Sequence, residues 1–294
     1  VPYNTYSVTA SRPGFLDGTA GPYVVTPGDA LQRDFVLVPE PPEPYDPLTD
    51  IGDQPTNVDD PVNPATGNFY LTKRLFTLPG AFNLNVVFDV GYNSLAGDSD
   101  GPLGHGWTHR YNVSLEQVGG EHVLALGDGA KTFFSYDAGN GIYEPVRCRP
   151  AGTLTDRDPD GWVYTLPGGV AYELDAQGRL ERLVSPAGAA LTFGHSTQLD
   201  RITDTAGWEI DLTYVGGRLA TISSNAFGGN VATFAYDGAG NLTGITDARG
   251  GSGGFSYDGA HRMLTVTDRR GVQVAANTYD ADGRVVEQVD AAGH

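Results

Sequence analysis

The stretch YDGAGNLTGITD, residues 236–247, decides the fold of this chain because close copies of it follow at a nearly fixed distance. The second copy is YDGAHRMLTVTD at 257–268, and the third is YDADGRVVEQVD at 279–290. A fixed period of this length is typical of repeat architectures, in which each unit buries its apolar face only against its neighbours. The stretch therefore predicts a repeat protein.

The aromatic residue that opens each copy belongs to a longer series. Intervals of 21, 21, 22, 21 and 22 residues separate Tyr172, Phe193, Tyr214, Tyr236, Tyr257 and Tyr279. A unit of this length divides into two strands of ordinary length and two turns. We expect the six rings to form a structural ladder along one face, with each phenol reaching a neighbouring backbone group. The alternative is an exposed aromatic strip that binds sugar or peptide.

The remaining composition predicts an all-β chain. Glycine contributes 41 and proline 19 of the 294 residues, and they separate short β-branched and aromatic runs such as 86–90 and 231–236. Nowhere do apolar residues recur at helical spacing over three turns, so strands are expected throughout. Tight turns between these strands predict a positive φ at Gly238, Gly240, Gly259 and Gly283.

The charge of the chain restricts its partners. There are 36 Asp and Glu residues against 18 Lys and Arg, which gives a net charge of −18 and a pI near 4.5. Phosphate backbones and anionic lipid repel such a chain, so we expect neither nucleic-acid binding nor membrane insertion. Cys148 is the one cysteine, and its thiol has no recognisable His-Asn partner. We interpret it as incidental.

The first part of the chain predicts a separate segment and a linker. Within residues 1–39, three short runs at 6–10, 23–25 and 35–38 have strand character and resemble the closing strands of a small prealbumin-like sandwich. Three strands are too few to bury a sandwich core alone. Residues 40–64 hold prolines among acidic residues, and this composition predicts an extended linker.

Motifs beyond the linker carry a family resemblance. The stretches DPVNPATGNF (60–69), LPG (78–80), YNS (92–94) and GHGWTHRY (104–111) resemble the amino-terminal domain of YD-repeat (Rhs) proteins. The aromatic series from 172 to 294 resembles their YD repeats. These proteins are large bacterial exported or surface proteins, related to the shells of toxin complexes and to teneurins. The resemblance implies β-hairpins that wind into a spiralling sheet, and an extracellular or cell-surface location.

The resemblance also sets the remaining boundaries. It implies an Rhs-type domain over 65–118, a β-hairpin transition region over 119–171 and six YD repeats over 172–294. The carboxyl-terminal core signature of the family, Asp-Pro-x-Gly-Leu, is absent from this sequence. No cleavage residue and no toxin activity are therefore carried over, and we expect the chain to be a piece of a longer protein.

One acidic loop is a candidate metal site. In DRDPDG, residues 156–161, the spacing of Asp156, Asp158 and Asp160 places three carboxylates on one tight loop, as oxygen-only calcium sites require. The bidentate Glu expected at the twelfth position is missing, and Pro167 stands there. An acidic hairpin turn is the alternative interpretation. No other cofactor is expected.

The sequence favours a structural protein over an enzyme. It has no nucleophile elbow, no phosphate-binding loop and no His-Glu-x-x-His metal motif, so no catalytic residue is assigned. Three hypotheses remain. The first is an extracellular structural or adhesive β-repeat protein that pairs with other copies or with the rest of a longer chain. The second is the amino-terminal part of a toxin-delivery shell, and the third is a carbohydrate-binding module.

Overall fold

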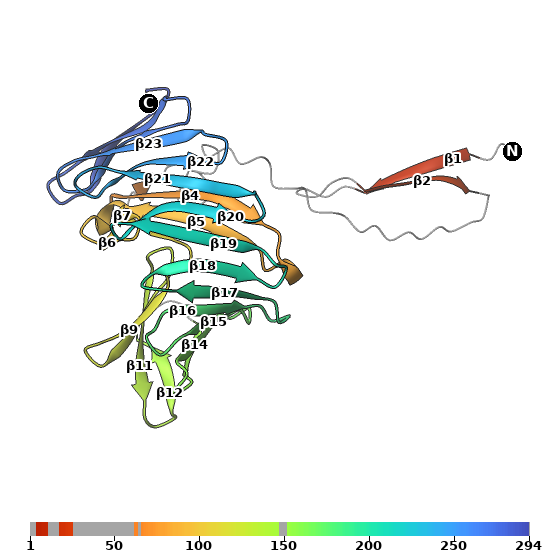
Figure 1. Ribbon diagram of the computed structural model, residues 1–294, viewed down its shortest axis with the longest axis horizontal. Helices are drawn as coiled ribbons and strands as arrows, with labels where there is room; N and C mark the ends of the chain where they lie inside the picture. Colours follow the sequence, from red (N-terminus) through yellow and green to blue (C-terminus); the bar gives the residue numbers. More distant parts are fainter. Residues whose placement is uncertain (1–3, 11–17, 26–61, 64–65, 147–151, 294) are drawn as a thin grey trace. The chain divides into compact units, whose positions relative to one another are not determined.

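The computed structural model describes residues 4–10, 18–25, 62–63, 66–146 and 152–293 (Figure 1). The chain divides into two compact units, Val1–Asp46 and Pro47–His294. In the first unit, β1 (Asn4–Ala10) and β2 (Gly18–Val25) form an antiparallel pair. The third expected strand at 35–38, Cys148 and most of the expected linker lie outside the described residues.

The second unit begins with a small antiparallel sheet, which we name the cover sheet. Its strands are β3 (Val62–Asn63), β4 (Asn68–Leu78), β5 (Val86–Asn93) and β8 (Trp107–His109), in the order β3-β4-β5-β8. Apolar residues alternate along β4 and β5, so one face of this sheet is buried. The 3₁₀ turns η2 (Ala81–Asn83) and η3 (Ser94–Ala96) and the hairpin of β6 (Asp100–Gly101) and β7 (Gly104–His105) complete the segment.

The remainder forms one antiparallel sheet of 18 strands, in which each strand pairs with the next in the sequence. Its first eight strands are β9 (Ser114–Val118), β10 (Glu121–Ala125), β11 (Lys131–Asp137), β12 (Ile142–Pro145), β13 (Thr153–Asp156), β14 (Trp162–Thr165), β15 (Ala171–Leu174) and β16 (Leu180–Val184). The next five are β17 (Ala190–His195), β18 (Leu199–Asp204), β19 (Glu209–Val215), β20 (Arg218–Ser224) and β21 (Gly229–Tyr236). The last five are β22 (Leu242–Asp247), β23 (Ser252–Tyr257), β24 (Met263–Thr267), β25 (Gln273–Tyr279) and β26 (Val285–Asp290).

The sheet curls on itself and then continues. At the start of β9, Ser114 forms a bridge with Arg179, and the Leu115 amide donates to the Gly178 carbonyl at 2.8 Å. One turn of the sheet therefore spans β9 to β16, and β17 to β26 carry it onward (Figure 1). The predicted all-β fold, with hairpins in a spiralling sheet, is confirmed.

The cover sheet packs on the inner face of the later hairpins. The ring centroids of Trp107 and Phe255 lie 5.0 Å apart, and those of Tyr111 and Phe193 also lie 5.0 Å apart. Both sheets contribute to one continuous hydrophobic core. In Figure 1, β4 and β5 lie against β19, β20 and β21. The core thus sits between two sheets, as burial of one face of each requires.

Candidate functional site: the seam between the two sheets

A β-bulge recurs near the turn of each of the last six hairpins, from β15–β16 to β25–β26. A bulge interrupts the ladder and leaves backbone groups free for other partners. The residues at the equivalent position of the six hairpins are Leu174, His195, Tyr214, Tyr236, Tyr257 and Tyr279. We name this series the bulge column.

The last four members of the bulge column make the same contact. The hydroxyls of Tyr214, Tyr236, Tyr257 and Tyr279 donate to the carbonyls of Leu199, Leu219, Leu242 and Met263, respectively, at 2.6–2.8 Å. Each accepting residue is the cross-strand partner of the bulge column in the preceding hairpin. His195 contacts the Leu180 carbonyl at 2.7 Å through Nε2. The bulge column therefore connects each hairpin to the preceding one by a hydrogen bond.

Two residues of the expected ladder lie elsewhere. Phe193 and Tyr172 come two residues before the bulge column, so His195 and Leu174 hold the equivalent positions. Phe193 is buried, and it aligns with the core residues Leu212 and Phe234 of later hairpins. Sequence spacing alone cannot locate a bulge, and the interval between His195 and Tyr214 is shorter than the regular period. Of the six aromatic residues expected to form the ladder, only the four tyrosines from Tyr214 onward therefore occupy equivalent positions.

The phenols of the bulge column are half-buried hydrogen-bond donors. Burial raises the pKa of Tyr236 above its usual range, and the pKa values of Tyr214 and Tyr279 shift in the same direction for the same reason. An apolar environment disfavours the charged phenolate. These hydroxyls therefore stay protonated and bound to carbonyls, and their contacts are structural.

An aspartate follows the tyrosine in the last three hairpins and organises the turn of each. The Asp258 carboxylate accepts the amides of Ala260 and Arg262 at 2.9 Å, and it also binds the Arg262 side chain at 2.7 Å. Asp237 and Asp280 accept the amides two and four residues later in the same way. Burial raises the pKa of Asp258, but these hydrogen bonds outweigh burial and lower it below the usual value. Much of the acidity of the chain thus serves turn geometry, a role that the sequence interpretation missed.

The turn glycines correct another expectation. The left-handed position falls three residues after the aspartate, where Gly240 has φ 84° and Gly283 has φ 79°. Gly238 and Gly259 do not have positive φ. His261 holds the left-handed position of its own turn, with φ 62°.

Backbone carbonyls beside the cover sheet bind amides that the bulges leave free. The Leu219 amide donates to the Pro102 carbonyl at 2.8 Å, and the Val285 amide donates to the Gly67 carbonyl at 2.8 Å. Leu219 therefore uses its carbonyl for the next hairpin and its amide for the segment beside the cover sheet. We name this line of contacts the seam.

Tyr92 and Trp107 make the most buried contacts of the seam. The Tyr92 hydroxyl accepts the Met263 amide at 2.9 Å and donates to the His261 carbonyl at 3.0 Å. The indole of Trp107 donates to the Tyr257 hydroxyl at 2.8 Å. Burial raises the pKa of Tyr92 far above its usual range. The GHGWTHRY motif thus supplies a seam residue, although the motif by itself does not indicate the partner of Trp107.

Arg218 fixes the β6–β7 hairpin to the repeats. Its guanidinium pairs with Asp100 at 2.5 Å and donates to the Gly101 carbonyl at 2.6 Å. The hydrogen bond from Arg218 lowers the pKa of Asp100 below the usual value. Charge therefore reinforces backbone pairing at this end of the seam.

The candidate calcium loop is the turn between β13 and β14. Asp156 accepts the Asp158 amide at 2.8 Å, and the Arg157 amide donates to the Gly161 carbonyl at 2.8 Å. Within the described part of the chain, no three His, Cys, Asp or Glu side chains are placed to hold a metal ion. Asp156, Asp158 and Asp160 therefore do not converge, and the geometry is that of an acidic hairpin turn. Calcium binding stays an untested prediction.

The described residues include no helix that is both long and apolar enough to cross a membrane.

Comparison with known proteins gives two family matches and a similarity to a solved structure. The RHS repeat profile matches residues 216–252 and 236–273, and a domain of unknown function, DUF6531, matches residues 59–134. A structure described as "Crystal Structure of TcdB2-TccC3-TEV" is 10% identical with a TM-score of 0.33, and the similarity covers 75% of this chain and 15% of that chain. No curated protein matches. The resemblance to YD-repeat proteins is confirmed by the repeat and domain matches.

Proposed function

The chain carries RHS repeats, and on that premise we propose that it is a structural wall segment of a larger RHS-type shell, with its own inner cover. The observation that carries this function is the seam, where groups in and beside the cover sheet bind the amides that the repeat bulges leave free. A sheet that lines a compartment must satisfy polar groups on its inner side. The cover sheet supplies these partners over the later repeats.

A structural role accounts for the polar groups that the fold brings together. The ladder phenols bind carbonyls, and the turn aspartates bind amides, so both are engaged in holding hairpins. We assign no catalytic step to them. The family resemblance places such shells outside the cell, and we propose an extracellular or cell-surface location on that ground.

The two alternative functions differ in what they require of the surface. Self-assembly into filaments requires strand pairing between copies. Carbohydrate binding by the ladder requires exposed tyrosines, whereas the four ladder tyrosines are half-buried and already donate to carbonyls. The contacts therefore favour the wall segment over the sugar-binding module.

The test is light scattering of the purified chain, combined with electron microscopy, with and without calcium. A wall segment is expected to be a dispersed monomer whose class averages show one curved sheet. Regular filaments would overturn the wall-segment role and support self-assembly. A calcium-dependent change in mass would support the metal prediction for the 156–161 turn.

A glycan array provides the second measurement, with Tyr236→Phe as a matched variant. Absence of binding is the expected result. Binding that is lost in this variant while the fold remains intact would contradict the structural role of the ladder.

A further inference from the structure

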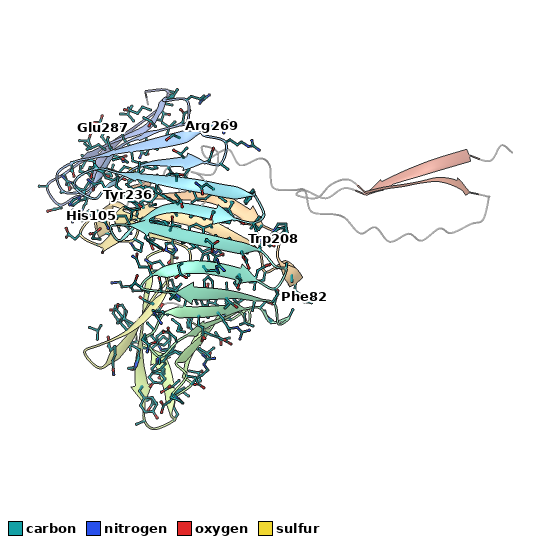
Figure 2. All side chains as sticks on the ribbon, in the orientation of Figure 1. Phe82, His105, Trp208, Tyr236, Arg269 and Glu287 are labelled. Carbon is teal, nitrogen blue, oxygen red and sulfur yellow. The ribbon has the colours of Figure 1, made fainter. Side chains whose placement is uncertain are left out.

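Two histidines that are distant in the sequence meet face to face at the seam. His105 lies on β7 and His261 lies in the turn between β23 and β24, and their ring centroids are 3.5 Å apart with an interplanar angle of 14°. Nδ1 of His105 lies 3.1 Å from the Gly97 carbonyl, and Nδ1 of His261 lies 2.7 Å from Asn241 Oδ1. Figure 2 labels His105 beside the hairpin that carries it. We name this pair the histidine stack.

The backbone of His261 has a left-handed conformation that is unusual for a residue with a side chain. The same turn position is glycine at Gly240 and Gly283, where the left-handed conformation has no steric cost. His261 takes this conformation with φ 62° although it carries a Cβ. Such strain persists where the surroundings require the side chain, and it is concentrated at binding and switch sites. Here the imidazole is placed directly on His105.

The charges around the stack are already matched. Asp100 pairs with Arg218 at 2.5 Å, and Asp258 pairs with Arg262 on the turn of His261 at 2.7 Å. Nε2 of His105 lies 4.0 Å from Asp100. Each carboxylate near the stack thus has its own arginine. Two protonated imidazoles in this place would face each other and share Asp100 with the guanidinium of Arg218.

We propose that the histidine stack is an acid-sensitive latch that releases the β6–β7 hairpin from the repeats. Histidine is the side chain whose charge normally changes between about pH 5 and 8. At neutral pH the two rings stack and hold the hairpin on the turn. In acid each imidazole binds a proton, the two positive rings repel each other, and the adjacent contact from the Leu219 amide to the Pro102 carbonyl opens. The latch presupposes the cover role proposed above.

Hydrogen exchange of the Leu219 amide tests the latch in the full chain, because this amide is protected only while Pro102 remains in place. After correction for intrinsic exchange, its opening is expected to increase about tenfold or more between about pH 7.5 and about pH 5. The variant His261→Gly removes one imidazole and suits the left-handed backbone. His105→Phe keeps an aromatic ring that cannot titrate. In both variants the opening should increase clearly less than in the wild-type chain over the same range, and what remains is the general loss of stability in acid.

The control is His122→Phe on β10, because this histidine contacts Tyr143 and Trp162 of the first curl. It should retain the wild-type response. An acid response equal to wild type in both stack variants would overturn the latch, as would its loss in the control. If Leu219 exchanges without protection already at neutral pH, the cover role itself fails. The two proposals can therefore fail separately.

A titration of the wild-type chain by nuclear magnetic resonance avoids dependence on any variant. The ring signals of His105 and His261 should change over the same pH range in which the Leu219 amide loses its protection. A change in these ring signals with no accompanying change at Leu219 would contradict the latch.

Discussion

The later repeats and the first curl of the same sheet bury their inner faces by different means. Between β17 and β26, the cover sheet packs on the inner face. The bulged hairpins there form hydrogen bonds both with the preceding hairpin and with groups in and beside the cover sheet. Between β9 and β16, the strands turn tightly and fill the interior with their own side chains, as the contact of Phe134 with Tyr164 at 6.0 Å shows. Curvature therefore decides which part of the spiral needs a partner.

Ring contacts show the same difference. In the first curl, His122, Tyr143 and Trp162 pack on one another with centroids 4.5–5.2 Å apart. Tyr136 extends this cluster and is 55% exposed. In the covered region, Tyr92 is fully buried and Trp107 nearly so. The rings of the first curl therefore pack within its own strands, whereas those of the covered region join the cover sheet to the repeats.

Removal of a large seam residue should give the largest effect. Trp107→Ala leaves a cavity in the core and removes the donor to Tyr257, so the free energy of unfolding should fall by about 3–5 kcal/mol. Urea denaturation followed by circular dichroism measures it. Trp162→Ala in the half-buried cluster of the first curl is the matched control and should cost clearly less. Equal losses would remove the distinction between the two regions.

Acid should weaken the cover sheet next. His109 is buried against Phe88, and burial lowers its pKa to about 4. The unfolded chain has a histidine pKa near 6.5, so it binds the proton first and stability falls as pH drops from about 6.5 to about 4. The full contribution is about 3 kcal/mol. Denaturation midpoints at a series of pH values should show this slope, and His109→Phe should flatten it.

The same titration with His122→Phe serves as the comparison from the first curl. That imidazole is less buried, so its replacement should change the pH slope less. A pH slope that persists in full after His109→Phe would show that burial of this histidine is not its cause.

Loss of a turn carboxylate should have an intermediate effect. Asp258→Ala removes two backbone hydrogen bonds and one arginine partner, so we expect a loss of about 1–2 kcal/mol. Because its pKa is lowered in the fold, this contribution is present above about pH 4 and disappears as pH falls further. Asp156→Ala in the turn of the first curl removes one backbone bond and should cost less. Thermal unfolding at neutral pH measures both losses. A larger loss for Asp156→Ala than for Asp258→Ala would contradict this assignment of the turn hydrogen bonds.

The smallest expected effect concerns one hydroxyl. Tyr236→Phe leaves the Leu219 carbonyl without its donor, which should cost about 1 kcal/mol. Tyr136→Phe removes an exposed hydroxyl and should change stability by less than about 0.5 kcal/mol. Chemical denaturation measures the free energy of unfolding of both variants. Equal losses in the two variants would contradict a structural role of the ladder hydroxyls.

Much of the fold could be predicted from the sequence because hairpin repeats are local. The period, the turn glycines and the run of YD pairs indicated strands, hairpins and their number. The exact ladder could not be predicted, because residues two apart lie on the same face of a strand and spacing alone does not choose between them. Phe193 therefore stood in the series where His195 belongs.

The candidate site was less accessible to prediction. Sequence reasoning noticed Trp107 and Tyr92 only as parts of motifs, and it interpreted Asp156 as a possible metal ligand. A residue type shows what a side chain can bind, but its partner depends on which segment packs against it. Tyr92 and Met263 are 171 residues apart and still share a hydrogen bond.

The sequence by itself determined a repeating all-β chain, because the period of apolar and turn residues fixes which backbone groups pair locally. Tertiary structure alone decided how the inner face is covered and which histidines meet. His105 and His261 lie in hairpins that are distant in the sequence, and the residues around each histidine do not indicate the other as its partner. Their stack exists because the curved repeats bring one turn over the β6–β7 hairpin, and contacts between distant segments arise only when both sheets are in place.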